Sequence, residues 1–177
     1  MRKPKLIYYN DGRHYHLYRH DPPMSLHRLR EPVDDILGTG VDTLSYGLAT
    51  GLTFLHNTKV GIKFGENVTE HNSGLVWWRA ATNLVEALEA GYDPLKVAVD
   101  RAHEKGIQII CSMRMNGGNT ATHFRGSYTA GKLQRYNPEA LLGEEDPESP
   151  SVAGAYDYAR PEVREERLAV IEEVCDR

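Results

Sequence analysis

Hydrophobic residues follow two different spacings along this chain. Short runs of bulky residues, which are typical of strands, cover residues 5–10, 41–46 and 107–111. Stripes of apolar residues at every third or fourth position, which are typical of helices, cover residues 25–37, 80–90, 94–105 and 161–176. Strands and helices therefore alternate, and this alternation predicts an α/β fold.

The stretch 92–116 gives the clearest local prediction. Asp93 can cap a helix whose first residue is Pro94, and Gly106 can end that helix in the left-handed conformation. The strand 107–111 follows at once, and its short β-branched sequence predicts burial on both faces. Because a helix leads into this strand without a hairpin turn, the sheet is expected to be parallel.

Polar residues gather where the three strands end, which is where parallel sheets bind ligands. We expect hydrogen bonds to a ligand from the residues at or after these ends, with Tyr46 or Trp78 as an aromatic platform and His123 as a further contact. The expected substrate-binding residues are Asn10, Asp11, Tyr46, Trp78, Arg114, Asn116 and His123. The alternative is that Asn10 and Asp11 cap a turn and that Arg114 pairs with a loop acid.

Composition narrows the classes of function. A chain of 177 residues suits one domain, and a net charge of −4 gives no general attraction to nucleic acid or anionic lipid. Two cysteines make no disulfide framework, and no apolar stretch is long enough for an export signal or a membrane span. We therefore expect a cytoplasmic protein without a cofactor. Ten tyrosines and two tryptophans against three phenylalanines suit either polyhydroxylated ligands or a half-buried sheet rim.

A histidine-rich segment after the first strand gives a rival prediction. His14 and His16, with Asp11 before them and His20 after, could ligate zinc if later strands completed the shell. The neighbouring Arg13 and Arg19 are cationic and disfavour a metal, so the other interpretation is a loop with exposed histidines.

Three motifs in fixed order resemble a known family. They are Tyr-Tyr-Asn-Asp at 8–11, Asp-Pro-Leu at 93–95 followed by Ala-His-Glu-Lys-Gly-Ile at 102–107, and Asp-Tyr-Ala-Arg-Pro-Glu-Val-Arg at 157–164. In this combination the chain resembles the glycosyl-hydrolase-like proteins of the family-10-like type, a bacterial group of (β/α)8 barrel glycosidases. The resemblance covers most of this chain but only the first half of such a barrel.

The resemblance implies a parallel-stranded partial TIM barrel, in which residues 1–177 form one domain with the first three βα units. It implies glycosidic bond hydrolysis by the intact protein, with the two catalytic carboxylates on strands that these residues do not contain. The chain alone is then expected to be inactive and to self-associate through open sheet edges. Two alternatives are a non-catalytic carbohydrate-binding barrel and a metal-dependent hydrolase that uses His14 and His16.

Overall fold

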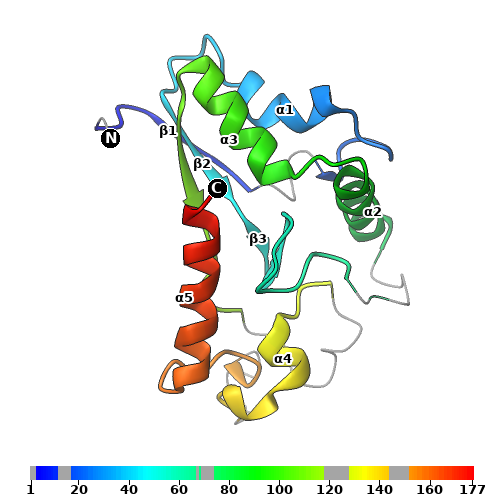
Figure 1. Ribbon diagram of the computed structural model, residues 1–177, viewed down its shortest axis with the longest axis vertical. Coiled ribbons are helices and arrows are strands. Elements are labelled where there is room, and N and C mark those ends of the chain that lie inside the picture. The colour runs from blue at the N-terminus through cyan, green and yellow to red at the C-terminus, as the bar shows by residue number, and fades with distance from the viewer. Residues whose placement is uncertain (1–2, 12–16, 67, 69–73, 118–127, 144–151) are drawn as a thin grey trace. The chain divides into compact units, whose positions relative to one another are not determined.

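The computed structural model describes residues 3–11, 17–66, 68, 74–117, 128–143 and 152–177. The chain forms two compact units. Unit 1 comprises Met1–Ala49, Leu55–Asn57 and Ser73–Met113, and unit 2 comprises Thr50–Phe54, Thr58–Asn72 and Arg114–Arg177. The elements in chain order are β1 (Ile7–Asn10), α1 (Leu26–Asp34), β2 (Thr43–Gly47), β3 (Ala49–Thr50), β4 (Thr53–Phe54), α2 (Leu75–Glu89), α3 (Pro94–Lys105), β5 (Gln108–Ser112), α4 (Lys132–Tyr136), a 3-10 turn (Pro138–Ala140) and α5 (Pro161–Cys175) (Figure 1).

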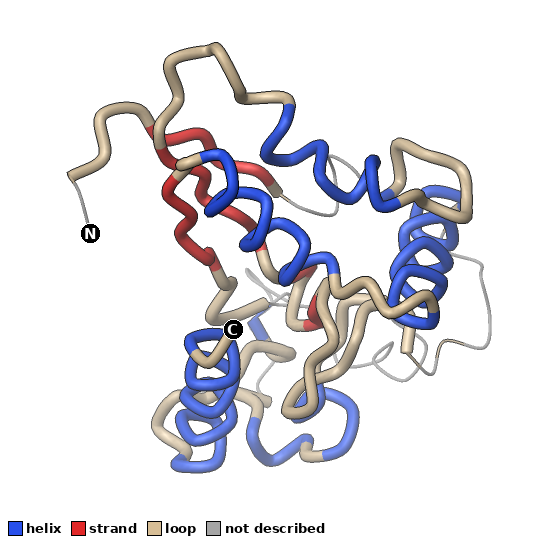
Figure 2. The backbone as a smooth tube through the Cα atoms, turned by 45° about the horizontal axis from the view of Figure 1, so that its top comes forward, coloured by secondary structure: helices blue, strands red, loops and turns tan. Residues whose placement is uncertain are grey.

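Unit 1 is built on a three-stranded parallel sheet in the order β1-β2-β5. Figure 2 shows the three strands side by side, with helix lying along one side of the sheet. The predicted α/β class and the parallel pairing are confirmed, because every strand of this sheet is reached through a helical crossover rather than a hairpin.

Only one face of this sheet is well covered. Leu44 and Tyr46 of β2 are buried, as are Leu95, Ala98 and Ala102 of α3, which packs against β5 and α1. On the alternate positions of the strands, three large side chains are 36–52% exposed, namely Ile7, Tyr9 and Ile110. The expectation that strand 107–111 is buried on both faces is therefore wrong, because β5 is an edge strand and its second face lacks a cover among the described residues.

The helix ends in unit 1 follow the sequence closely. The Ser25 side chain caps α1, the Asp93 side chain caps α3, and Gly106 ends α3 with φ of 68° in the left-handed region. Helix α2 begins at Leu75, earlier than the expected residue 80, and its N-cap Gly74 has φ of 103°. Both tryptophans therefore lie in the first turns of α2 instead of in a loop before it.

Unit 2 has a separate apolar core, made of Leu52, Ala130, Ala140, Leu141, Tyr156 and Val163. The short strands β3 and β4, helix α4 and the 3-10 turn lie in stretches for which the sequence predicted no regular structure. Elements of two to five residues are too short to show a hydrophobic period, so pattern analysis does not detect them. In the described part of the chain, no helix combines the length and apolar character needed to cross a membrane.

Candidate functional site

The carboxyl ends of the three parallel strands place one residue of each strand in a row. Asn10 of β1 pairs in register with Tyr46 of β2, and Tyr46 pairs with Cys111 of β5. Residues in register across a parallel sheet point to the same face, so these three side chains are neighbours. Two predicted site residues, Asn10 and Tyr46, are thus brought together as expected.

Asn10 is the unusual member of this row. The residue is 1% exposed, and neither its Oδ1 nor its Nδ2 atom has a hydrogen-bond partner among the described residues. A buried amide without a partner costs about 1–3 kcal/mol, and most buried polar groups in proteins avoid this cost. Asn10 therefore has an unused donor and an unused acceptor at the carboxyl edge of the sheet.

Tyr46 lies on the helix-covered face of the sheet. Burial raises the pKa of its phenol far above the usual value, and the nearby Asp93 carboxylate and Cys111 thiol raise it further. The hydroxyl therefore stays protonated and neutral. Because the residue is only 1% exposed, its ring cannot serve as the aromatic platform that we expected from the sequence.

Asp93 joins the start of α3 to the loop after β4. One carboxylate oxygen accepts a hydrogen bond from the Leu95 amide (3.0 Å), and the other accepts one from the Asn57 amide (3.3 Å). The same carboxylate lies close enough to Tyr46 to raise the pKa of that phenol. The loop that contains Asn57 is thus fixed beside the carboxyl ends of the strands.

The other predicted site residues are not members of this row. Asp11 follows β1 directly and is half-buried, whereas Trp78 lies on α2 and is 37% exposed. Arg114 and Asn116 are exposed residues of unit 2. His123, and the predicted metal ligands His14 and His16, lie outside the described residues.

Asn116 has a structural role in unit 2. Its Oδ1 atom accepts hydrogen bonds from the amides of Tyr156 (2.8 Å) and Gly117 (2.9 Å), and its Nδ2 atom donates to the Tyr156 carbonyl (3.2 Å). These bonds fix the segment before α5 to the segment after β5. One of the two donors of the Nδ2 group is left for a ligand, so Asn116 can make fewer ligand contacts than the sequence suggested.

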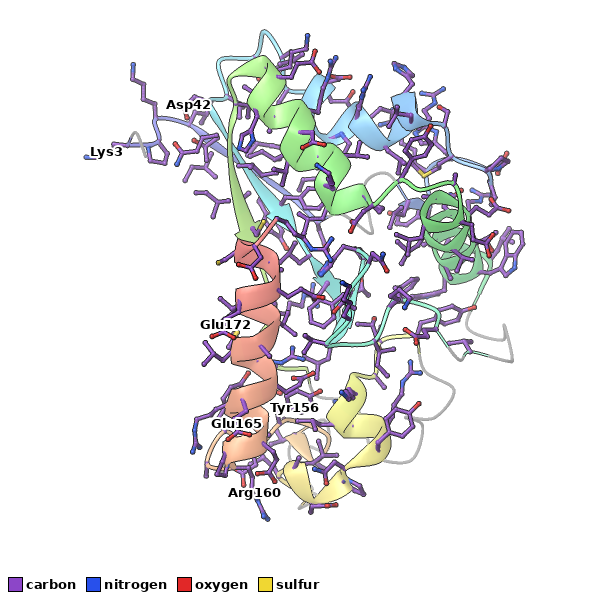
Figure 3. All side chains as sticks on the ribbon, viewed as in Figure 1. Lys3, Asp42, Tyr156, Arg160, Glu165 and Glu172 are labelled. Atoms are coloured by element: carbon purple, nitrogen blue, oxygen red, sulfur yellow. The ribbon has the colours of Figure 1, made fainter. Side chains whose placement is uncertain are left out.

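Unit 2 contains a buried ion pair that the sequence did not predict. Arg167 of α5 is 1% exposed, and its Nε and Nη2 atoms donate to the Glu166 carboxylate at 2.5 and 2.6 Å. The guanidinium carbon also lies 5.5 Å from the centre of the Phe54 ring and 5.2 Å from that of Tyr156, the residue labelled beside α5 in Figure 3. The only available signal was spacing, because Arg167 lies four residues after Val163 and three before Val170, both buried on α5.

The described residues contain no group of three or more histidine, cysteine or acidic side chains that could hold a metal ion. The arrangement at the carboxyl edge of unit 1 can donate and accept hydrogen bonds through the Asn10 amide. Its chemistry suits the recognition of a neutral polar ligand.

No known family model matches the chain, and no curated protein matches it either.

Proposed function

We propose that this chain forms the first βα units of a glycosidase-like (β/α)8 barrel and contributes carbohydrate-binding groups to the carboxyl edge of that barrel. The observation that carries the proposal is the Asn10 amide, which is buried at the carboxyl end of a parallel strand and has no hydrogen-bond partner among the described residues. A sugar hydroxyl is both donor and acceptor, so a pair of hydroxyls can satisfy both amide atoms.

The uncovered face of the sheet supports the barrel. Ile7, Tyr9 and Ile110 are apolar or amphipathic side chains that a closed barrel would bury in its interior. The outer edges of β1 and β5 have no strand partner among the described residues, so each edge can pair with a further parallel strand.

The individual residues take different roles in this proposal. Asp11, which is half-buried, contacts the sugar from the end of β1. Asn10 lies on the same covered face as Tyr46 and is 1% exposed, so its amide contacts only a sugar hydroxyl that enters at the strand end. Tyr46 is buried beside Asn10 on the covered face and does not stack on the sugar. Hydrolysis requires a pair of carboxylates about 5–10 Å apart, and in this proposal those carboxylates belong to later strands of the barrel.

The test compares two buried asparagines of unit 1. Asn10→Leu removes an amide that no described residue pairs with, so the free energy of unfolding is expected to stay the same or rise. Asn83→Leu is the matched control, because the Asn83 Nδ2 atom donates to the carbonyls of Leu17 (2.6 Å) and His20 (2.9 Å). Loss of those bonds is expected to cost about 1–3 kcal/mol.

Binding of soluble cello-, xylo- and malto-oligosaccharides is measured by calorimetry on the wild-type chain and both variants. The proposal expects an oligosaccharide affinity that Asn10→Leu lowers at least tenfold, while Asn83→Leu leaves it unchanged under conditions where the variant is folded. Absence of binding to any of the probes, or an affinity that is insensitive to Asn10→Leu, would refute the proposal. Binding without release of reducing sugar is the expected result for this chain.

A further inference from the structure

A groove in unit 1 lies away from the row of strand ends, between helices α1 and α3. It has a volume of about 280 Å³, close to the lower end of the roughly 300–1,000 Å³ found for small-ligand sites. Leu26 and Arg30 line it from α1, and Tyr92, Val97, Asp100 and Glu104 are among the residues that line it from the other side. The groove therefore combines apolar surface with several charged groups.

Most of these charged groups already have partners. The Asp100 carboxylate pairs with Lys96 at 2.9 Å, and the Glu104 carboxylate pairs with Arg101 at 2.7 Å and with Lys105 at 3.2 Å. Arg101 also pairs with Asp34 of α1 at 2.7 Å. The acidic side chains of the groove wall are thus neutralised by neighbouring cations.

The Asp93 carboxylate, which also borders the groove, is occupied in a different way. Its two oxygens accept the backbone hydrogen bonds from Leu95 and Asn57 described above. This carboxylate therefore acts as the helix cap of α3, and it is held by backbone donors.

Arg30 is the exception among the charged groups. Its side chain is half-buried, and the guanidinium makes no hydrogen bond or ion pair with any described residue. A guanidinium presents its donors in a planar fork that matches a carboxylate. The groove therefore places a cation that has no partner among the described residues beside the apolar side chains of Leu26 and Val97 and the ring of Tyr92.

We propose that this groove binds a small organic carboxylate. The carboxylate forms a two-point ion pair with the Arg30 guanidinium, and the apolar part of the ligand packs against Leu26, Tyr92 and Val97. This site is separate from the sheet edge of the proposed function, and neither proposal depends on the other.

The test is a ¹H–¹⁵N NMR titration of the whole chain with benzoate, which has a planar carboxylate and an apolar ring. Benzyl alcohol is the neutral control ligand of similar size. We expect benzoate to shift the amide signals of residues along the groove, with a Kd on the order of 1 mM, while benzyl alcohol binds at least tenfold more weakly.

Two variants locate the carboxylate. Arg30→Gln is expected to raise the Kd for benzoate at least tenfold, which corresponds to about 1.4 kcal/mol. Lys5→Gln removes the same charge from an exposed position of unit 1 outside the groove and is expected to change the Kd less than twofold. Arg30→Lys keeps the charge but loses the planar fork, so it should weaken binding by an intermediate factor.

Three results would overturn the proposal. They are equal binding of benzoate and benzyl alcohol, a benzoate Kd that Arg30→Gln leaves unchanged, and shifts that appear across the surface instead of along the groove. If Arg30→Gln failed to fold, Arg30→Lys and the comparison of the two ligands on the wild-type chain would still decide the outcome.

Discussion

The buried ion pair of α5 allows a quantitative prediction for unit 2. Arg167→Met keeps a long, flexible side chain between the rings of Phe54 and Tyr156 but removes the charge. Glu166, whose side chain is 8% exposed, then loses the cation that holds both of its oxygens. Removal of one partner from a buried ion pair costs about 3–5 kcal/mol, because the other charge stays buried without compensation.

The double variant Glu166→Gln with Arg167→Met removes both charges and supplies the control. Replacement of a whole buried ion pair by neutral residues of similar volume is often neutral or stabilising. We therefore expect the double variant to recover most of the stability that Arg167→Met loses. The contacts between the guanidinium and the two rings, each worth about 0.5–2 kcal/mol, set the part that is not recovered.

Amide hydrogen exchange measures this effect in unit 2 directly. The amides of Phe54 and Phe64 donate to the carbonyls of Ile62 and Phe54 at 2.8 Å, so their exchange reports the opening of this region. Arg167→Met should accelerate their exchange by roughly two to three and a half orders of magnitude. Tryptophan fluorescence reports unit 1, since both tryptophans lie on α2. The reasoning is refuted if Arg167→Met leaves exchange at Phe54 unchanged, or if the double variant is less stable than the single one.

Three further predictions concern unit 1. Burial raises the pKa of Glu31, but hydrogen bonds from Arg28 and His20 outweigh this effect and hold the folded-state pKa below the ordinary 4.5. Glu31 therefore stabilises the fold above about pH 4.5, and this stabilisation is lost as the pH falls through the lower folded-state pKa. Urea unfolding at a series of pH values should show the difference between wild type and Glu31→Gln narrowing in acid, and a difference that is independent of pH would contradict this. Asp93→Ala removes the cap of α3 and should lower the free energy of unfolding, measured by thermal denaturation, by about 0.5–2 kcal/mol. Asp93→Asn should remain close to wild type, and equal losses of stability in the two variants would argue against capping. Gly106→Ala places a side chain at φ of 68° where no atom lies within 4 Å, so the expected loss of about 1–2 kcal/mol in the free energy of unfolding is purely conformational. Gly106→Asn should lose less stability, and the melting temperatures of the two variants test this order.

Local sequence determined the regular elements of unit 1. The cap at Asp93, the proline at 94 and the glycine at 106 each act within one helical turn, so their effect does not depend on distant residues. The parallel pairing followed from helices placed between strands, because a helical crossover returns the chain to the end of the sheet at which the previous strand began. Tyr46 and Asn10 were correctly placed at strand ends for the same reason.

The tertiary structure decided which side chains face a ligand and which are structural. The burial and hydrogen bonding of a side chain depend on residues that are distant in the sequence. The residues next to Tyr46, Asn116 and Arg167 in the sequence therefore do not predict these contacts. Tyr46 is covered by the helix layer, Asn116 is held by the backbone of Tyr156, and Arg167 occupies an apolar position because Glu166 and two rings compensate its charge. The sequence identified Asn10 as a polar residue at a strand end, but only the packing around it showed that its amide is buried and that no described residue bonds to it.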